Sequence, residues 1–242
     1  MTRLDGRRPD DLRPIRITPG YLEYAEGSAL LERGGPSVLC AASAGERVPP
    51  FLRGAGSGWV TAEYGMLPRS TRTRTPREAM VGRPSGRTQE IQRLIGRSLR
   101  AVTDLDLLGE QSFIVDCDVI RADGGTRTAA ITGAYVALRQ AFQKQVDSGA
   151  LPAMPLKDAI AAVSLGIVDG VPLLDLTYEE DSRAEVDFNV AMTGAGEFVE
   201  VQASGESASF SKAAMEELLA LAAKGIRELL DAQKTALEQV QQ

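Results

Sequence analysis

A glycine turn at residues 123–128, with the sequence Asp-Gly-Gly-Thr-Arg-Thr, constrains the fold most strongly. It follows an apolar, β-branched run at 113–120 that predicts a strand, and it precedes an apolar run from 129 that predicts a helix. Glycine lets the backbone approach a ligand closely, and the first helical turn offers unpaired N–H groups. With Gly125 in the turn and Thr126 and Arg127 as side-chain donors, the unit predicts a phosphate site. A tight turn without a ligand is the alternative, because glycine is common in such connections.

A second segment, Ser85-Gly86-Arg87-Thr88, has the same arrangement. It combines a turn containing glycine, an arginine and a helical pattern of apolar residues over 88–102. Arg87 is therefore a second candidate for binding phosphate. Two such units predict a protein whose chemistry involves phosphate groups.

Charge is distributed unevenly along the chain of 242 residues, whose net charge is −6. Residues 69–100 carry nine arginines, two glutamates and no lysine, a net charge of +7 that leaves −13 for the remainder. Bidentate contacts with phosphate favour arginine over lysine, so this cluster, which includes Arg69, Arg72, Arg74 and Arg77, predicts contacts with phosphate groups. The alternative is a solvated loop that forms salt bridges with the acidic part of an oligomer.

The pattern of apolar runs predicts an α+β fold with layered sheets and helices. Expected strands of the first half lie at 15–18, 28–31, 37–42, 59–66 and 112–122, and its helices at 88–102 and 129–148. The second half has expected strands at 159–168, 171–178, 184–192 and 197–204 and a helix at 211–240. Asp169-Gly170 between the first two of these predicts a hairpin. The chain has enough apolar residues for one core or for two fused halves.

Two acidic residues complete a candidate site. Asp181 is expected at the end of one strand and Asp187 at the start of the next, where they could converge on a hard cation such as Mg²⁺, with phosphate oxygens as further ligands. On spacing alone, turn residues or surface charges are the alternative. The chain has no histidine, which excludes catalysis by imidazole and zinc sites that use it. Carboxylates, arginines and a metal suit in-line displacement at phosphorus.

Cellular context is indicated by what the sequence lacks. Cys40 and Cys117 lie in strand-like apolar runs and are expected to be buried free thiols. No run of about 18 apolar residues exists to cross a bilayer, and the polar, charged residues 1–16 do not resemble a secretory signal. We therefore expect a cytoplasmic protein with no membrane partner.

The sequence resembles the ribonuclease PH family, phosphate-dependent 3′→5′ exoribonucleases that trim tRNA precursors. The resemblance covers nearly the whole chain and depends on a set of motifs: Asp5-Gly6-Arg7, Leu12-Arg13-Pro14, and the segments at 58–68, 85–91, 94–100, 123–128, 180–181 and 186–189. The sequence departs from the family pattern at Arg72, where histidine is expected, and at Pro36-Ser37, where Thr-Lys is common.

The resemblance implies a fold of two related β-α halves, of the type of ribosomal protein S5 domain 2, packed into a single domain over 1–242. It implies that Arg87, Gly125, Thr126 and Arg127 bind inorganic phosphate. Asp181 and Asp187 would form the catalytic pair that binds Mg²⁺ or Mn²⁺. RNA would contact Arg69, Arg74 and Arg77, and the RNA-binding set that we predict also includes Arg72. The members of the family assemble as hexamers, trimers of dimers.

The activity implied is a tRNA nucleotidyltransferase: phosphate attacks the RNA 3′ end, a nucleoside diphosphate leaves, and the reverse reaction adds nucleotides. Two other functions remain possible on the sequence alone. One is a non-catalytic RNA-binding ring subunit of an exosome-like assembly, although relatives of that kind usually lose an acid or an arginine from the site. The other is a hydrolytic nuclease with the same metal site, which would not consume phosphate.

Overall fold

The computed structural model describes residues 3–45, 47–206 and 209–239 and has the α+β architecture that the sequence predicts. The strands of the first sheet are β1 (Ile15–Pro19), β2 (Gly27–Arg33), β3 (Ser37–Gly45), β4 (Trp59–Met66) and β5 (Ser112–Arg121). The strands of the second are β6 (Ile160–Val168), β7 (Val171–Leu174), β8 (Val186–Thr193) and β9 (Phe198–Gly205). The helices are α1 (Gly86–Ala101), α2 (Thr126–Asp147), α3 (Tyr178–Asp181) and α4 (Lys212–Glu238).

The first sheet has the strand order β1-β2-β3-β5-β4. Strands β1 to β3 form the antiparallel meander expected from their sequence, β5 pairs antiparallel with β3, and β4 pairs parallel with β5 at the edge. Cys40 and Cys117 are cross-strand partners in β3 and β5, and both are buried and free, as predicted. Helices α1 and α2 pack on this sheet and bury the apolar side chains that keep helical spacing.

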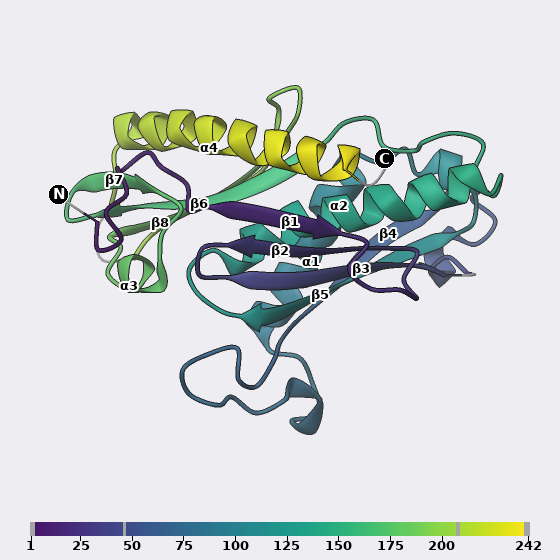
Figure 1. Cartoon of the computed structure of the whole chain (residues 1–242), viewed down its shortest axis with the longest axis horizontal. Helices are drawn as coiled ribbons and strands as arrows, with labels where there is room; N and C mark the ends of the chain where they lie inside the picture. The colour runs from purple at the N-terminus through teal and green to yellow at the C-terminus, as the bar shows by residue number, and fades with distance from the viewer. Residues whose placement is uncertain (1–2, 46, 207–208, 240–242) are drawn as a thin grey trace.

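The second sheet has the order β7-β6-β8-β9, with all neighbours antiparallel. Helix α4 covers it, and their apolar side chains form a second core. Helix α2 contacts strands of both sheets, so it lies at the junction of the two halves. Figure 1 shows this arrangement, with α4 running above β6 and toward α2.

The hairpin predicted at Asp169-Gly170 is confirmed, because β6 and β7 pair antiparallel around it. The expected strand at 171–178 is too long, however, since β7 ends at Leu174. Asp175 then adopts a φ of 55°, and Thr177 starts a short helix with a capping box in which its side chain and that of Glu180 satisfy each other's backbone N–H groups. Asp181 therefore lies on a helix, not at the end of a strand.

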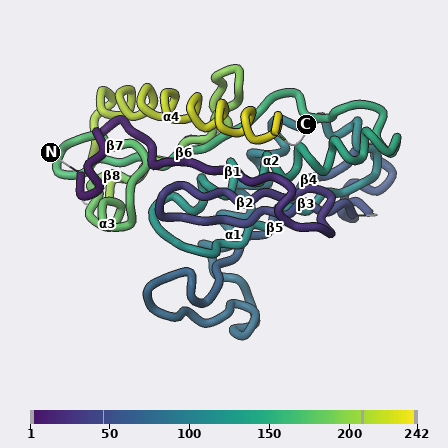
Figure 2. The backbone as a smooth tube through the Cα atoms, in the orientation of Figure 1, coloured from purple at the N-terminus to yellow at the C-terminus, as the bar shows by residue number. Residues whose placement is uncertain are grey.

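The arginine-rich loop projects from the body of the molecule. Figure 2 shows the chain between β4 and α1 as an extended excursion below the first sheet. Within it only a short 3-10 turn, η2 (Glu78–Met80), is regular. The other 3-10 turns are η1 (Pro50–Leu52) and η3 (Asp106–Leu108). Among the described residues, no helix is long and apolar enough to cross a membrane.

Candidate active site

A cavity of about 970 Å³ lies where the two halves meet. It is lined from the first half by the glycine turn and the first residues of α1 and α2, and from the second half by α3 and β8. All six residues predicted to bind phosphate or metal line it: Arg87, Gly125, Thr126, Arg127, Asp181 and Asp187. Two segments that are far apart in the sequence thus face one another across one space.

The glycine turn is shaped by close contacts on both sides. A Cβ atom on Gly124 would overlap the carbonyl of Leu176, and one on Gly125, whose φ is 80°, would overlap the guanidinium of Arg33. Only glycine fits such an approach. The turn therefore delivers the first N–H groups of α2 to the cavity, with the positive end of the helix dipole behind them.

Side chains on the first turn of α2 complete the anion side of the cavity. The buried phenol of Tyr64 donates a hydrogen bond of 2.9 Å to Oγ1 of Thr126. Arg127 donates to Gln202 Oε1 at 3.2 Å and lies 3.6 Å from a carboxylate oxygen of Glu90. These partners orient the guanidinium without burying it.

Arg87 comes from the first turn of α1. Ser85 caps this helix by accepting a hydrogen bond of 3.1 Å from the backbone N–H of Thr88. Arg87 forms no ion pair with any residue in the described ranges, and its charge partly opposes the rise that burial causes in the pKa of Asp181 and of Asp187. The two segments with the same sequence arrangement therefore place an arginine each in one cavity.

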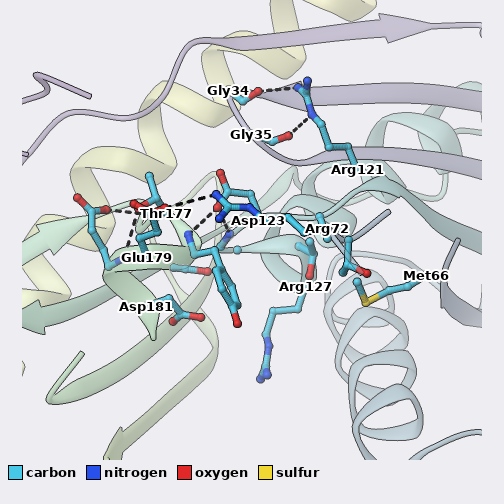
Figure 3. Close-up of a pocket in the computed structure, with 18 of the residues that line it drawn as sticks. Gly34, Gly35, Met66, Arg72, Arg121, Asp123, Arg127, Thr177, Glu179 and Asp181 are labelled. Carbon is cyan, nitrogen blue, oxygen red and sulfur yellow. Dashed lines mark hydrogen bonds and ion pairs between the residues drawn. The ribbon is translucent and has the colours of Figure 1, made fainter. Parts of the chain in front are cut away.

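The two acids occupy the opposite side. Figure 3 shows Asp181 on α3 and Arg127 on α2 beside the same space. Burial raises the pKa of both Asp181 and Asp187, and the negative charge of Asp187 raises that of Asp181 further. Neither carboxylate forms an ion pair with another described residue. Two unpaired carboxylates that lie close together in one cavity carry a negative charge that a cation would neutralise.

The side chains that could act as metal ligands fit a hard cation that takes only a few of its ligands from the protein. Across the described ranges, no group of three or more His, Cys, Asp or Glu residues is arranged to hold a metal. A site with only Asp181 and Asp187 suits Mg²⁺, which usually keeps several waters and binds one or two carboxylates together with substrate phosphates. It does not suit zinc, which prefers nitrogen and sulfur ligands.

A buried ionic cluster behind the cavity was not predicted from the sequence. Arg13 pairs with Asp175 at 2.6 Å and with Asp123 at 3.1 Å, and the fully buried Arg33 lies 3.1 Å from Asp175. Burial opposes ionisation of Asp175, but the charges of Arg33 and Arg13 outweigh it and lower the pKa of this carboxyl to about 2. Arg13 also donates to the Gly124 carbonyl at 2.9 Å. The cluster thus ties the glycine turn to the segment that leads into α3.

The amino-terminal segment adds a further contact of this kind. Arg3 binds Glu180 through two hydrogen bonds of 2.8 and 2.6 Å, although the residues are 177 positions apart. Glu180 precedes Asp181 on α3, and Figure 1 shows the amino-terminal segment, drawn in purple, running beside β7. The amide N–H of Tyr178 donates to Asp123 Oδ1 at 2.5 Å, so α3 is also fixed to the glycine turn.

The arginines predicted to hold RNA do not lie together in the cavity. Arg72 lines it and lies 3.4 Å from Glu179, whereas Arg69, Arg74 and Arg77 of the same projecting loop are not among its lining residues. Another arginine lines the outer part of the cavity: Arg121 donates to the carbonyls of Gly34 and Gly35, as Figure 3 shows. It could not be distinguished by sequence pattern, because it stands alone at the end of β5.

Comparison with known proteins identifies the class to which this fold and site belong. The sequence model of domain 1 of the 3′ exoribonuclease family matches residues 11–142, and that of domain 2 matches residues 158–225. Together they cover the glycine turn, the cavity-lining first turns of α1 and α2, and both acids. The chain therefore belongs to the 3′ exoribonucleases, and its fold has two α+β halves that meet at a cavity lined by arginines and carboxylates.

Individual relatives narrow the assignment. A ribonuclease PH from Syntrophomonas wolfei is 57% identical over 237 residues, which cover 98% of this chain and 99% of that protein. A ribonuclease PH from Solibacter usitatus is 58% identical over 236 residues, with the same coverage of 98% and 99%. The chain belongs to the ribonuclease PH family, and its activity is that of a phosphate-dependent 3′→5′ exoribonuclease acting on RNA.

A solved structure agrees with the fold. A chain of the Archaeoglobus fulgidus exosome, solved with RNA bound to the active site, superposes with a TM-score of 0.82 at 25% identity. The match covers 95% of this chain and 91% of that one. The identity to the two bacterial enzymes is more than twice as high, which favours the phosphorolytic enzyme over a non-catalytic subunit of an exosome-like assembly.

Proposed function

We propose that inorganic phosphate binds to Arg87, Gly125, Thr126 and Arg127 and attacks the last phosphodiester of an RNA 3′ end. The observation that carries the proposal is that two arginines from separate helices and the glycine turn line the same cavity as two acids. The backbone N–H groups at the start of α2 and the guanidinium groups would hold the three free oxygens of phosphate.

In this reaction one phosphate oxygen forms a bond to the terminal phosphorus as the bond to the 3′ oxygen breaks. The shortened RNA keeps the 3′ oxygen, which takes up a proton, and the terminal residue leaves as a nucleoside diphosphate. Because the diphosphate retains a phosphoanhydride, the reverse reaction adds nucleotides from diphosphates. Positioning and charge neutralisation account for most of the catalysis of such a transfer.

Asp181 and Asp187 would hold Mg²⁺, or Mn²⁺ in its place, facing the phosphate side of the cavity. Such an ion supplies positive charge to the oxygens of the phosphate group that is transferred. The two acids lie opposite the arginines. The negative charge on the oxygens of the transferred phosphate group would therefore be neutralised by the metal ion on one side and by the arginines on the other. Because the chain has no histidine, a carboxyl group of this pair is a candidate to help protonate the departing 3′ oxygen.

The position of the projecting loop supports the use of separate residues for the chemical step and for RNA binding. We assign Arg69, Arg74 and Arg77 to the RNA backbone outside the cavity, and Arg72 to the entrance that it lines. Contacts to phosphates position RNA without reading its sequence. The substrates we propose are tRNA precursors with extra 3′ nucleotides, recognised by shape.

The assembly and location follow from the same family. We propose that the chain acts as a single domain over 1–242, because α2 and the buried cluster around Asp175 join the two halves. We further propose a homohexamer, a trimer of dimers, working in the cytoplasm. Sedimentation velocity or mass photometry of the purified protein would test the assembly.

The experiment that tests the function uses a tRNA carrying a few extra 3′ nucleotides and Mg²⁺, with and without inorganic phosphate. Release of nucleoside diphosphates only when phosphate is present is the expected result. Nucleoside monophosphates released independently of phosphate would show a hydrolase. No release, combined with salt-sensitive binding of the tRNA, would show a non-catalytic RNA-binding subunit.

A further inference from the structure

A chain of buried polar side chains connects the glycine turn of the first half with Asp187 in the second. Oγ1 of Thr128 on α2 lies 3.0 Å from both the Gly125 carbonyl oxygen and Oγ of Ser164 on β6, and because Ser164 gives its own proton to Asn189, these two acceptors share the single proton of Thr128. Ser164 donates to Oδ1 of Asn189 at 2.9 Å, and the amide of Asn189 donates to Oδ1 of Asp187 at 3.0 Å. The chain crosses from α2 through β6 to β8.

The strand register explains why these side chains meet. Ser164 and Asn189 are Cα partners in the antiparallel pair of β6 and β8, so their side chains point to the same face of the sheet. Asp187 is two residues before Asn189 on β8 and shares that face. Ser164 and Asn189 also line the cavity, while each is more than nine-tenths buried.

The direction of the hydrogen bonds fixes the orientation of the amide. A serine hydroxyl has one proton, and Ser164 gives it to the Asn189 carbonyl oxygen. The amide NH₂ group must then face Asp187. If the amide flipped, its oxygen would lie against a carboxylate, which is repulsive. Behind Ser164, the guanidinium of Arg33 holds Oγ1 of Thr128 at 3.2 Å.

We propose that Asn189 and Ser164 are positioning residues for phosphorolysis, holding Asp187 by its Oδ1 atom and leaving Oδ2 for the reaction. This inference rests on the proposed role of Asp187. The bond from Asn189 is the only one that the Asp187 side chain makes to the described part of the chain. The other end of this series of hydrogen bonds is the Gly125 carbonyl. The same contacts therefore set the position of Asp187 relative to the glycine turn.

A purely structural role would also account for a hydrogen-bonded chain, because buried polar groups need partners. The two roles differ in what a substitution changes. A purely structural series of hydrogen bonds affects stability and leaves the kcat and the Mn²⁺ affinity of the folded protein unchanged. A positioning chain affects turnover and cation binding, and Ser164 acts only through Asn189, so their effects should not add.

The test compares Ser164→Ala, Asn189→Ala and the double variant. We expect each single variant to lower kcat by about 10- to 100-fold, the range typical of groups that orient metal ligands, and to change the KM for phosphate by less than about threefold. The double variant should be no slower than Asn189→Ala alone. Titration of the RNA-free protein with Mn²⁺, followed by electron paramagnetic resonance, should show weaker binding in all three.

Thr193→Val is the matched control, because Thr193 is a buried polar residue of β8 whose hydroxyl accepts from Glu197 at the far hairpin. It should leave kcat and Mn²⁺ affinity unchanged. Multiplying losses in the double variant, or Mn²⁺ affinity equal to that of the unmodified protein, would overturn the positioning role. Asp187→Asn separates this from the proposed site: if that variant kept full activity, the assignment of Asp187 itself would be wrong, whatever the coupling.

Discussion

Tyr64 donates its hydroxyl proton to Oγ1 of Thr126 across 2.9 Å, and this leaves the proton of Thr126 free to point elsewhere. Burial raises the pKa of Tyr64, so the phenol keeps its proton at neutral pH. Thr126 lines the cavity, where its remaining proton would be available to an anion. The strand residue Tyr64 therefore determines which way a proposed phosphate ligand donates.

The variant Tyr64→Phe should raise the KM for inorganic phosphate about fivefold, because a neutral hydrogen bond contributes about 1 kcal/mol. The aromatic ring stays, so the core around it should change little. Initial rates over a series of phosphate concentrations measure this. Tyr135→Phe is the control, since Tyr135 is also a largely buried tyrosine but lies outside this cavity. An unchanged KM in Tyr64→Phe would mean that Thr126 does not bind phosphate through its hydroxyl.

Arg127 should be harder to replace. Arg127→Ala is expected to raise the KM for phosphate and lower kcat, with a combined loss of about 10- to 100-fold, because a charge-assisted hydrogen bond contributes about 1.5–3 kcal/mol. Arg127→Lys should recover only part of this, since lysine cannot present two parallel N–H groups. Arg93→Ala, an exposed arginine on α1, is the control and should behave like the unmodified protein. Equal kinetics for Arg127→Ala and the control would remove Arg127 from the anion site.

Local sequence patterns were sufficient for the parts of the fold that local chemistry determines. The glycine turn, the start of α2 and the Asp169-Gly170 hairpin all depend on residues that are neighbours in the sequence. The two-residue period of a strand likewise puts Asp187 and Asn189 on one face, where a hydrogen bond of 3.0 Å joins them. The cavity could be anticipated only in part, as two separate anion units and two acids.

Long-range ion pairs could not be predicted, because their partners leave no local signal. Asp175 follows an apolar run and looked like part of a strand, but Arg13 and Arg33 bind it and the chain turns there. Helix α3 follows directly, so the expected strand was too long and Asp181 was placed on the wrong element. Arg33 ends β2 as if it were a surface residue, yet it is fully buried against its ionic partner.

The buried cluster predicts how stability depends on acid. The pKa of Asp175 is lowered from 3.8 to about 2, so its ionised form contributes roughly 2 kcal/mol to the free energy of unfolding above about pH 4. A depressed pKa means that this contribution is lost as the pH falls from about 4 to 2. Urea unfolding at a series of pH values measures it.

Asp175→Asn provides the comparison. Removing one partner leaves the guanidinium of Arg33 buried without its counter-charge, so the variant should be less stable at pH 7 by about 3–5 kcal/mol. The difference in free energy of unfolding between Asp175→Asn and the unmodified protein should become smaller as the pH falls toward 2. Asp231→Asn, which removes an exposed carboxylate of α4 that forms no ion pair with any described residue, should follow the unmodified protein throughout. A difference between Asp175→Asn and the unmodified protein that did not vary with pH would show that Asp175 is not the titrating group.

The projecting loop should govern RNA binding without affecting the chemistry. Replacing Arg74 and Arg77 with alanine removes two proposed phosphate contacts, so the slope of log affinity against log salt should fall by about 1.4 on single-stranded RNA. The reverse reaction on a nucleoside diphosphate with a very short primer should keep its rate, because neither residue lines the cavity. Replacing two exposed basic residues of α4, Arg227 and Lys234, is the matched control for net charge. If both pairs changed the salt slope equally, the loop would act only through total charge. If the short primer suffered as much as the long RNA, Arg74 and Arg77 would have to be assigned to the active site.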